Sequence, residues 1–221
     1  MLKNKTTVLF QGDSVTDAGR SRTSDELLGN GYPFHVRNLL DSEYPNLEIT
    51  ILNRGISGNR AVDLLARWDE DCLKLKPDYV SILIGVNDTW RRYDNNDPTA
   101  PDVFKDRLKA IIEKTLDGGC ADILLLNPFL LDVNENVTAM REDLCFKQDA
   151  VAALAKEYNT KFLDLDKVFK EAAKERTPAF YAEDGVHPTQ AGHLLIAKEW
   201  LAVWAQELFE VGFWQGETDG F

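Results

Sequence analysis

Three residue types that together can perform nucleophilic chemistry lie near the two ends of this 221-residue chain. Ser14 is part of Gly-Asp-Ser-Val-Thr-Asp, close behind the apolar run Thr-Thr-Val-Leu-Phe. A serine hydroxyl is a weak nucleophile until a neighbouring base accepts its proton, and His187 is the candidate base. Asp184 precedes His187 by three residues, so it could hold the imidazole in one tautomer and stabilise its charge. The set predicts a serine nucleophile activated by a histidine–aspartate pair.

Two further segments could supply the hydrogen-bond donors that such a reaction needs. Attack on an ester carbonyl creates an oxyanion, which is stabilised best by donors that are fixed before the reaction begins. Gly58, in Asn-Arg-Gly-Ile-Ser-Gly-Asn, and Asn87, in Gly-Val-Asn-Asp, are candidates beside the backbone N–H of Ser14. Glycine at position 58 would let the backbone approach a substrate closely. We therefore predict an oxyanion hole formed by Ser14, Gly58 and Asn87.

Each of the four segments also has an ordinary structural explanation. Ser14 and Asn87 could cap helices, and the glycine of the second segment could serve a turn. Asp184 and His187 could be a solvated pair in a loop. Four such segments that follow strands of one chain favour a shared site instead.

Strand-like and helix-like patterns alternate along the whole chain. Short apolar or alternating runs predict five strands, at residues 6–10, 47–53, 78–84, 122–127 and 160–165. Apolar residues at helical spacing predict helices after Pro33 and over residues 61–68, 103–116, 138–158 and 191–209. The pattern predicts one domain over residues 1–221, an α/β fold with three layers around a five-stranded parallel sheet. Because ligands bind at the carboxyl ends of such strands, the four segments are expected on one rim.

Charge and hydropathy narrow the classes of partner. The formal net charge of −12 disfavours nucleic acid and anionic membrane surfaces, because both repel an acidic protein. No apolar run approaches the roughly 20 residues that span a bilayer. The first residues lack the apolar stretch of a signal peptide, so a cytoplasmic location is expected.

The cysteines and the remaining histidines do not indicate a metal or a cofactor. Cys72, Cys120 and Cys145 are far apart and contain no Cys-x-x-Cys pair, so neither a disulfide framework nor a zinc site is predicted. His35, inside a predicted helix, and His193, near the start of another, are interpreted as structural residues. We therefore expect catalysis without a bound metal.

The four segments together resemble the blocks of the SGNH (GDSL-type) esterases, and they extend over nearly the whole chain. Val15 stands where the family's name has leucine, which is a mild departure. The resemblance implies a flavodoxin-like α/β/α fold and ester hydrolysis by Ser14, Asp184 and His187. It also implies the oxyanion hole of Ser14, Gly58 and Asn87, and it implies no metal or organic cofactor.

Longer stretches, such as Asn-Arg-Gly-Ile-Ser-Gly-Asn-Arg-Ala-Val-Asp and Ile-Gly-Val-Asn-Asp-Thr-Trp-Arg-Arg-Tyr, are similar to bacterial acetylxylan esterases. This similarity implies a small acetylated sugar as substrate, most simply a xylo-oligosaccharide. Asp13, Trp90 and Tyr93 are the candidate substrate-binding residues, since aromatic faces stack well on sugar rings. A lipid esterase of the lysophospholipase or thioesterase type, and a non-catalytic sugar-binding protein, are the alternatives.

The last residues carry three large aromatic side chains beyond the predicted final helix. They are Phe213, Trp214 and Phe221. Aromatic side chains are costly to expose and are enriched at protein interfaces. The tail could fold back over its own domain, but we favour a homo-oligomer in which the tail, or a surface that it covers, meets a neighbouring subunit.

Overall fold

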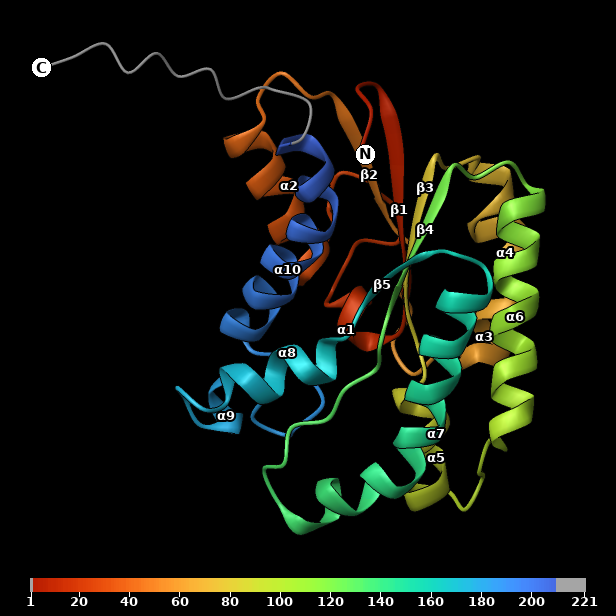
Figure 1. The fold of residues 1–221 in the computed structure, drawn as a ribbon, viewed down its shortest axis with the longest axis vertical. Helices are drawn as coiled ribbons and strands as arrows, with labels where there is room; N and C mark the ends of the chain where they lie inside the picture. The colour runs from red at the N-terminus through yellow and green to blue at the C-terminus, as the bar shows by residue number, and fades with distance from the viewer. Residues whose placement is uncertain (1, 210–221) are drawn as a thin grey trace, which may run out of the picture.

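The computed structural model describes residues 2–209, and within this range five parallel strands form the central sheet (Figure 1). The strands are β1 (Thr6–Gly12), β2 (Ile49–Asn53), β3 (Tyr79–Leu83), β4 (Asp122–Leu126) and β5 (Lys161–Leu163). Their order across the sheet is β2-β1-β3-β4-β5, and every neighbouring pair is parallel. All carboxyl ends therefore lie along one edge, with the switch in strand order next to β1.

Helices cover both faces of the sheet (Figure 1). On one side lie α2 (Tyr32–Glu43), α8 (Leu165–Ala172), α9 (Pro178–Tyr181) and α10 (Gln190–Phe209). On the other side lie α3 (Ala61–Ala66), α4 (Trp68–Asp71), the short 3₁₀ helix η1 (Leu73–Leu75), α6 (Pro101–Asp117) and α7 (Glu135–Glu157). Two further helices, α1 (Ser14–Asp17) and α5 (Val86–Asp94), begin at the carboxyl ends of β1 and β3.

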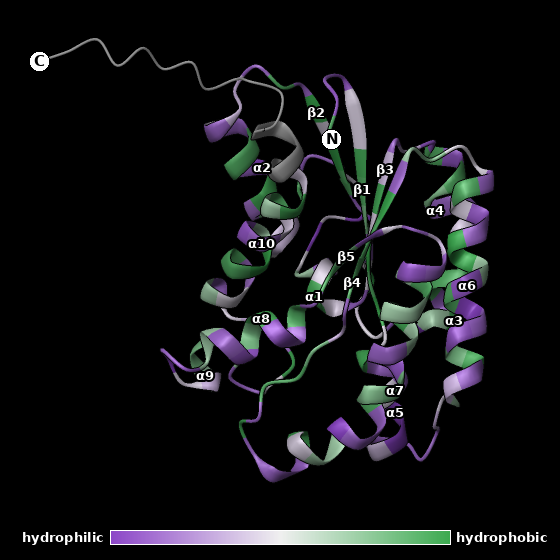
Figure 2. Cartoon of the chain, viewed as in Figure 1, coloured by the Kyte–Doolittle hydropathy of each residue, from purple (hydrophilic) through white to green (hydrophobic). Residues whose placement is uncertain are grey.

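The sheet is buried on both faces, as its hydrophobic strands require. Val8 and Phe10 of β1 pack towards α2 and α10, whereas Leu9 packs towards α3 and α6. Figure 2 shows largely hydrophobic strands in the centre and helices of mixed character on either side. Each such large apolar side chain stabilises the fold by roughly 1.5–3 kcal/mol when it is fully buried. This rigid sheet fixes the edge on which the polar segments lie.

Two buried tryptophans show how the core accommodates polar atoms. The indole Nε1 of Trp200 in α10 donates to Ser81 Oγ of β3 at 3.0 Å. On the other face, Trp68 Nε1 donates to Thr115 Oγ1 of α6 at 3.1 Å. A buried donor without a partner costs about 1–3 kcal/mol, so these pairs explain a serine and a threonine inside the core.

The predicted fold class is confirmed. All five strands occur where the sequence predicts them, with ends that differ by a few residues. The sequence prediction did not include α5 and α8, and the helix expected over residues 61–68 is interrupted at Arg67, which ends α3 and precedes α4. Among residues 2–209, no helix has the length and apolar character needed to cross a membrane. The aromatic tail with Phe213, Trp214 and Phe221 lies outside the described residues.

Candidate active site

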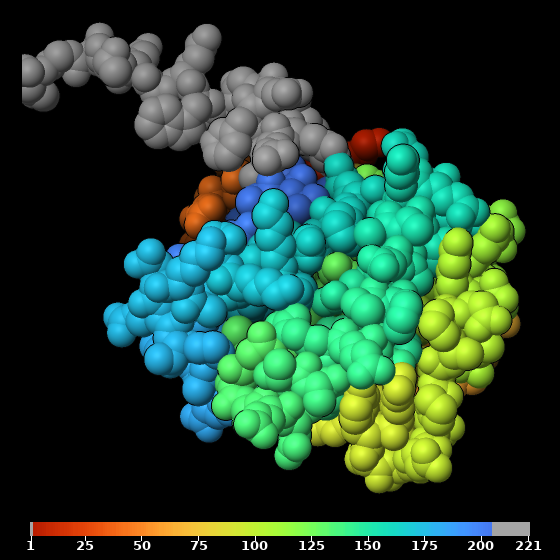
Figure 3. All heavy atoms as spheres, turned by 60° about the horizontal axis from the view of Figure 1, so that its bottom comes forward, coloured from red at the N-terminus to blue at the C-terminus, as the bar shows by residue number. Residues whose placement is uncertain are grey.

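The four segments meet at the carboxyl edge of the sheet. Ser14 begins α1 directly after β1, Gly58 follows β2, Asn87 follows β3, and Asp184 and His187 lie between α9 and α10. Figure 3 turns this end of the molecule forward, where the green segment around residues 128–140 lies beside the blue segment around residues 165–190. A hydrogen bond between backbone groups joins the two segments.

The position of Ser14 is set by the short connection between β1 and α1. A side chain at Gly12 would lie 2.4 Å from Leu83 O of the neighbouring strand, so only glycine fits there. Asp13 then caps the short helix, because its Oδ1 accepts from Val15 N–H at 3.0 Å. The Asp13 carboxyl is almost completely buried, and this burial raises its pKa to about 7. The geometry places the Ser14 side chain at the surface while its neighbours Asp13 and Val15 point inwards.

Asp184 and His187 lie on a turn that holds them face to face. Asp184 Oδ1 accepts from the backbone N–H groups of Val186, at 2.9 Å, and His187, at 2.7 Å, while Oδ2 contacts His187 Nδ1 at 2.6 Å. Partial burial alone would raise the pKa of Asp184, but the hydrogen bonds from His187 and Val186 lower it below its ordinary value. The carboxylate is therefore kept ionised beside the imidazole.

Gly185 lets this turn pack against the rest of the molecule. Its φ is +82°, and a side chain would lie 2.5 Å from Leu131 O. Leu131 N–H in turn donates to Gly185 O at 2.8 Å, which joins the turn to the segment after β4. Arg141 secures that segment by donating to Leu130 O and by pairing with Asp166 at 2.9 Å.

The serine, the histidine and the aspartate form a continuous chain of contacts. Ser14 Oγ lies 2.9 Å from His187 Nε2, although 173 positions separate the two residues in the sequence. Because the Asp184 carboxylate only accepts hydrogen bonds, the proton of a neutral His187 belongs on Nδ1. Nε2 is then free to accept the Ser14 proton. This is the arrangement that activates a serine for attack on a carbonyl carbon.

Three hydrogen-bond donors face the same edge. Neither the Ser14 N–H nor the Gly58 N–H has an acceptor among residues 2–209. Asn87 Nδ2 donates one hydrogen to Asn59 O at 3.1 Å, which leaves its second hydrogen for another acceptor. The bond also ties α5 to the loop that carries Gly58. The three groups predicted as an oxyanion hole therefore lie at one edge with donor capacity to spare.

The predicted substrate-binding residues lie in three different environments. The Trp90 ring is half-buried, and its centroid is 5.9 Å from that of His187. Tyr93, one turn further along α5, is exposed, but its hydroxyl donates to Ala139 O of α7 at 3.0 Å. Asp13 lies beneath the surface, with 1% of its area exposed. Trp90 is thus placed beside the reacting groups, whereas the polar atoms of Tyr93 and Asp13 are engaged within the protein.

Several charged residues around the site were not identified from the sequence. Asp88 is fully buried, its Oδ2 accepts from Ala61 N–H at 3.0 Å, and burial raises its pKa to about 6. Arg67 donates from Nε to Asn59 Oδ1 at 2.8 Å. Asp17 accepts from Ser57 N–H at 2.9 Å. Asp17 and Asp88 lie inside the sequence segments already singled out, so a charged residue within such a segment is the feature that could have identified them.

The two other histidines have structural partners. His193 is buried, its Nδ1 accepts from Tyr32 N–H at 3.2 Å, and burial lowers its pKa to about 4. His35 Nε2 contacts Gln190 Oε1 at 3.1 Å. Within residues 2–209, no group of three or more histidine, cysteine or acidic side chains is arranged to hold a metal ion.

A small cavity of about 10 Å³ lies next to Ser14, lined in part by its neighbours Asp13 and Val15. Such a volume is of the order needed for a single water molecule. Its lining residues are Asp13, Val15, Leu83, Val86, Pro128, Phe129 and Val186. This cavity is too small for a long acyl chain.

Comparisons with known proteins identify a family and several proteins to which this chain is similar. The model of the GDSL-like lipase/acylhydrolase family matches residues 10–195. An acetylxylan esterase from Geobacillus stearothermophilus is 40% identical over 216 residues, which cover 93% of this chain and 94% of the relative. A structure described as that of a candidate GDSL-like lipase from Parabacteroides merdae is 34% identical, with a TM-score of 0.87 and coverage of 92% of this chain and 97% of its own.

Further solved structures come from Geobacillus. One is a variant of an acetyl-xylooligosaccharide esterase, 39% identical with a TM-score of 0.85, which covers 91% of this chain and 94% of its own. Three others are described as catalytic mutants of an acetylxylan esterase, in which a serine, an aspartate or a histidine is replaced by alanine. Each of these is 38% identical, with a TM-score of 0.85 and coverage of 91% of this chain.

Proposed function

Because the chain belongs to the GDSL-like lipase/acylhydrolase family and is a carboxylic ester hydrolase, we propose that it removes acetyl groups from acetylated xylo-oligosaccharides. Ser14 is the nucleophile, His187 the general base and Asp184 the residue that orients the base. The observation that carries the proposal is the chain of contacts from Ser14 Oγ to His187 Nε2, at 2.9 Å, and from His187 Nδ1 to Asp184 Oδ2, at 2.6 Å.

In the first half of the reaction, Ser14 Oγ attacks the acetyl carbonyl carbon while His187 Nε2 takes the hydroxyl proton. The carbonyl oxygen becomes an oxyanion and accepts hydrogen bonds from Ser14 N–H, Gly58 N–H and Asn87 Nδ2. The bond between the carbonyl carbon and the sugar oxygen then breaks, and His187 gives its proton to that oxygen. The products are a free sugar hydroxyl and an acetylated Ser14.

In the second half, water replaces the sugar. His187 Nε2 takes a proton from the water molecule as its oxygen attacks the acetyl-enzyme, and the same donors stabilise the second oxyanion. Collapse of this intermediate breaks the bond to Ser14 Oγ, which recovers its proton from His187. The product is acetic acid, which leaves and loses its proton to the solvent, and Asp184 stays ionised throughout because it only stabilises the imidazolium.

The surroundings of the serine support a small acyl group and a sugar alcohol. The small cavity next to Ser14, of about 10 Å³, is far smaller than an acyl chain of a lipid would need. Trp90, half-buried beside His187, presents an aromatic ring of the kind that stacks on sugar rings. The names of the Geobacillus relatives, an acetylxylan esterase and an acetyl-xylooligosaccharide esterase, support the same class of substrate.

A comparison of esters tests the proposal. Initial rates are measured on p-nitrophenyl acetate, butyrate and octanoate, and acetate release is measured from acetylated xylo-oligosaccharides, with Ser14→Ala as the blank. We expect the acetyl ester to be preferred and acetate to be released from the oligosaccharides by the native chain alone. A preference for octanoate would identify a lipid esterase, and no turnover of any ester would contradict the assignment of the site.

A further inference from the structure

We propose that Asp17, supported by Arg22, is a positioning residue that fixes the loop between β2 and α3 and thereby the Gly58 N–H. This inference rests on the proposed function, because it assigns Gly58 to the oxyanion hole. Asp17 has no contact with Ser14 Oγ or with His187 among the described residues, so its influence on the reaction would act through the loop.

The loop, residues 54–60, needs an external support. Ser57 and Gly58 are exposed, and Gly58 has a φ of +83°, a conformation that only glycine adopts readily. The Gly58 N–H has no acceptor among residues 2–209, so no hydrogen bond of its own holds it in place. A donor that must be aligned before the reaction therefore depends on its neighbours for its position.

Asp17 provides the support directly beside this donor. Its Oδ2 accepts the N–H of Ser57, the residue before Gly58, at 2.9 Å. The Asp17 residue is 6% exposed, so solvent competes little for this bond. Asp17 ends α1, the helix that Ser14 begins. One short helix thus carries both Ser14 and the Asp17 carboxylate, which holds the loop of the Gly58 N–H.

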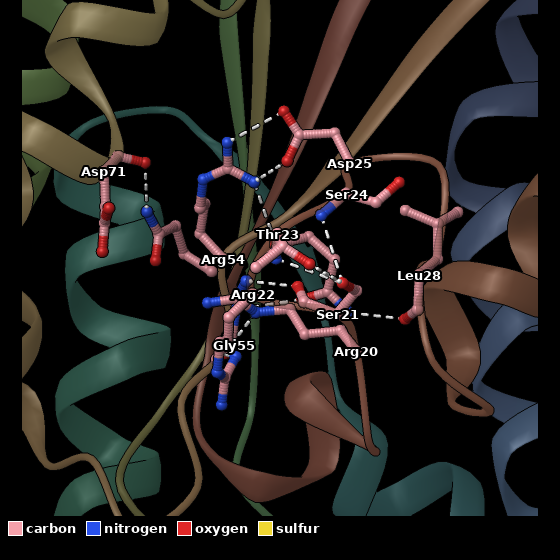
Figure 4. Close-up of polar contacts among 12 residues, drawn as sticks. Arg20, Ser21, Arg22, Thr23, Ser24, Asp25, Leu28, Arg54, Gly55 and Asp71 are labelled. Carbon is pink, nitrogen blue, oxygen red and sulfur yellow. Dashed lines mark hydrogen bonds and ion pairs between the residues drawn. The ribbon is translucent and has the colours of Figure 1, made fainter.

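Arg22 completes the support by linking Asp17 to the same loop. Arg22 Nη2 pairs with Asp17 Oδ2, and Arg22 Nη1 donates to Gly55 O at 2.9 Å. Arg20 Nε donates to that carbonyl as well, at 2.7 Å. Figure 4 shows the Arg20 and Arg22 side chains meeting at Gly55, beside the pair of Arg54 with Asp25.

The backbone packing shows that the contact is close. A side chain at Gly55 would lie 2.4 Å from Asp17 N, so the loop lies directly against α1. Ile56 N–H also donates to Gly12 O at 3.0 Å. The start of the loop is therefore anchored by its backbone, and Asn59, which follows Gly58, is bonded to Ile56, Arg67 and Asn87. Between these two anchored parts, the Ser57 N–H beside Gly58 is held by the Asp17 carboxylate.

Replacement of Asp17 is expected to lower kcat and to leave KM nearly unchanged. Deletion of one oxyanion donor lowers kcat by roughly 10²–10³. A displaced donor still binds weakly, so Asp17→Ala should lower kcat by about 10- to 100-fold, with KM changed by less than about 3-fold. Asp17→Asn keeps an oxygen that can accept from Ser57 N–H, so it should recover much of the loss.

A double-mutant cycle in the full chain decides whether the effect passes through the oxyanion hole. Asp17→Ala and Asn87→Ala are measured alone and together on p-nitrophenyl acetate. Both changes weaken stabilisation of the same oxyanion, so the combined loss in kcat should be smaller than the product of the two single losses. Asp78→Ala is the matched control, because Asp78 also accepts a backbone N–H, that of Thr7 at 2.8 Å, at the opposite end of the sheet.

Three outcomes would overturn the inference: an unchanged kcat in Asp17→Ala, a loss that is equal in the Asp78→Ala control, or strictly multiplicative losses. If Asp17→Ala does not fold, Arg22→Met replaces it, since the Arg22 side chain is 49% exposed and its removal leaves the core intact. An Arg22→Met enzyme with unchanged kcat would then overturn it. If Ser14→Ala is inactive in the same assay while Asp17→Ala is fully active, this inference fails and the proposed function stands.

Discussion

Ser14 lies on a helix whose flanking carboxyl groups, Asp13 and Asp17, are almost completely buried, whereas Asp184 and His187 lie on an exposed turn. We call the first region, residues 12–17 with the loop 54–60, the nucleophile region, and the second, residues 184–187, the base turn. Burial raises the pKa of Asp13 to about 7, but hydrogen bonds lower that of Asp184 despite its partial burial. Carboxyl groups of the same type therefore shift in opposite directions across a single site.

The two regions also differ in how far apart in the sequence their hydrogen-bonded residues lie. In the base turn, Asp184 bonds to residues two and three positions away. In the nucleophile region, the bond from Ser57 to Asp17 spans 40 positions, and the bond from Asn87 to Asn59 spans 28. A turn can align two side chains by itself, but donors from separate strands need the whole sheet to bring them together.

The difference indicates a division of tasks. A general base must exchange protons with substrate and water, so an exposed position beside an ionised carboxylate suits it. Oxyanion donors act best when they are fixed before the reaction begins, which the long-range hydrogen bonds of the nucleophile region favour. The four predictions below test this comparison, from the largest expected effect to the smallest.

Ser14→Ala removes the atom at which the two regions meet. Without the hydroxyl no acyl-enzyme forms, so we expect kcat to fall by about 10⁴-fold or more, while the melting temperature changes little. Activity on p-nitrophenyl acetate and thermal unfolding measure the two effects. Ser42→Ala, an exposed serine on α2, is the matched control and should keep full activity. A Ser14→Ala enzyme with native turnover would refute the assignment of the nucleophile.

Asn87→Ala tests the donor that comes from α5. It removes one proposed oxyanion donor together with the bond to Asn59 O, so we expect kcat to fall by roughly 10²–10³ with a smaller change in KM. Steady-state kinetics on an acetyl ester separate the two constants. Asn95→Ala, at the exposed end of the same helix, should leave both nearly unchanged. A change confined to KM would assign Asn87 to substrate binding instead.

The base turn and the sheet were predictable because local patterns encode them. The spacing of Asp184 and His187 needs only a turn with a glycine in it, and continuous apolar runs such as residues 79–83 indicate buried parallel strands. The family was recognised from the four segments, and the match of the family model over residues 10–195 confirms it. The sequence therefore led to the fold class and to the segments of the site.

The support of the nucleophile region was not predictable in the same way. Asp17 and Arg22 read as ordinary polar residues, because their partners Ser57 and Gly55 lie more than 30 positions away. Helix α5 was missed since its first residues, Val-Asn-Asp-Thr, include types that are also common in turns. The ionisation of Asp13 likewise depends on burial by strands and loops that are distant in sequence. These features follow from tertiary packing, which residue spacing does not specify.

The pH dependence of stability should be set largely by Asp13, in the nucleophile region. The pKa of Asp13 is about 7 in the folded protein, against about 3.9 in an unfolded chain, so the folded state retains a proton that the unfolded state releases. The free energy of unfolding should therefore fall as the pH rises from about 4 to 7, by on the order of 2–4 kcal/mol from this group. Urea unfolding at pH 5 and pH 8 measures the change.

Asp13→Asn provides the test of the group responsible. The amide is neutral at every pH and its oxygen can still accept from Val15 N–H, so the variant should lose less stability between pH 5 and pH 8 than the native chain does. Asp184→Asn should not flatten the profile. Because the pKa of Asp184 is lowered, its contribution to stability is complete above about pH 4 and does not change between pH 5 and pH 8. An identical slope in Asp13→Asn and the native chain would contradict the burial argument.

Tyr93→Phe should have the smallest effect, and it concerns the helix that links the two regions. Helix α5 carries Asn87 towards the loop and Trp90 towards His187, and the Tyr93 hydroxyl attaches this helix to α7 through Ala139 O at 3.0 Å. An exposed hydrogen bond contributes about 0.5–1.5 kcal/mol, so we expect a loss of stability in the lower part of that range. Because the hydroxyl is engaged within the protein, KM for acetylated xylo-oligosaccharides should change by less than about 2-fold. A 10-fold rise in KM without a loss of stability would show that the hydroxyl leaves Ala139 to bind the sugar, and would move Tyr93 from the support of α5 to the substrate site.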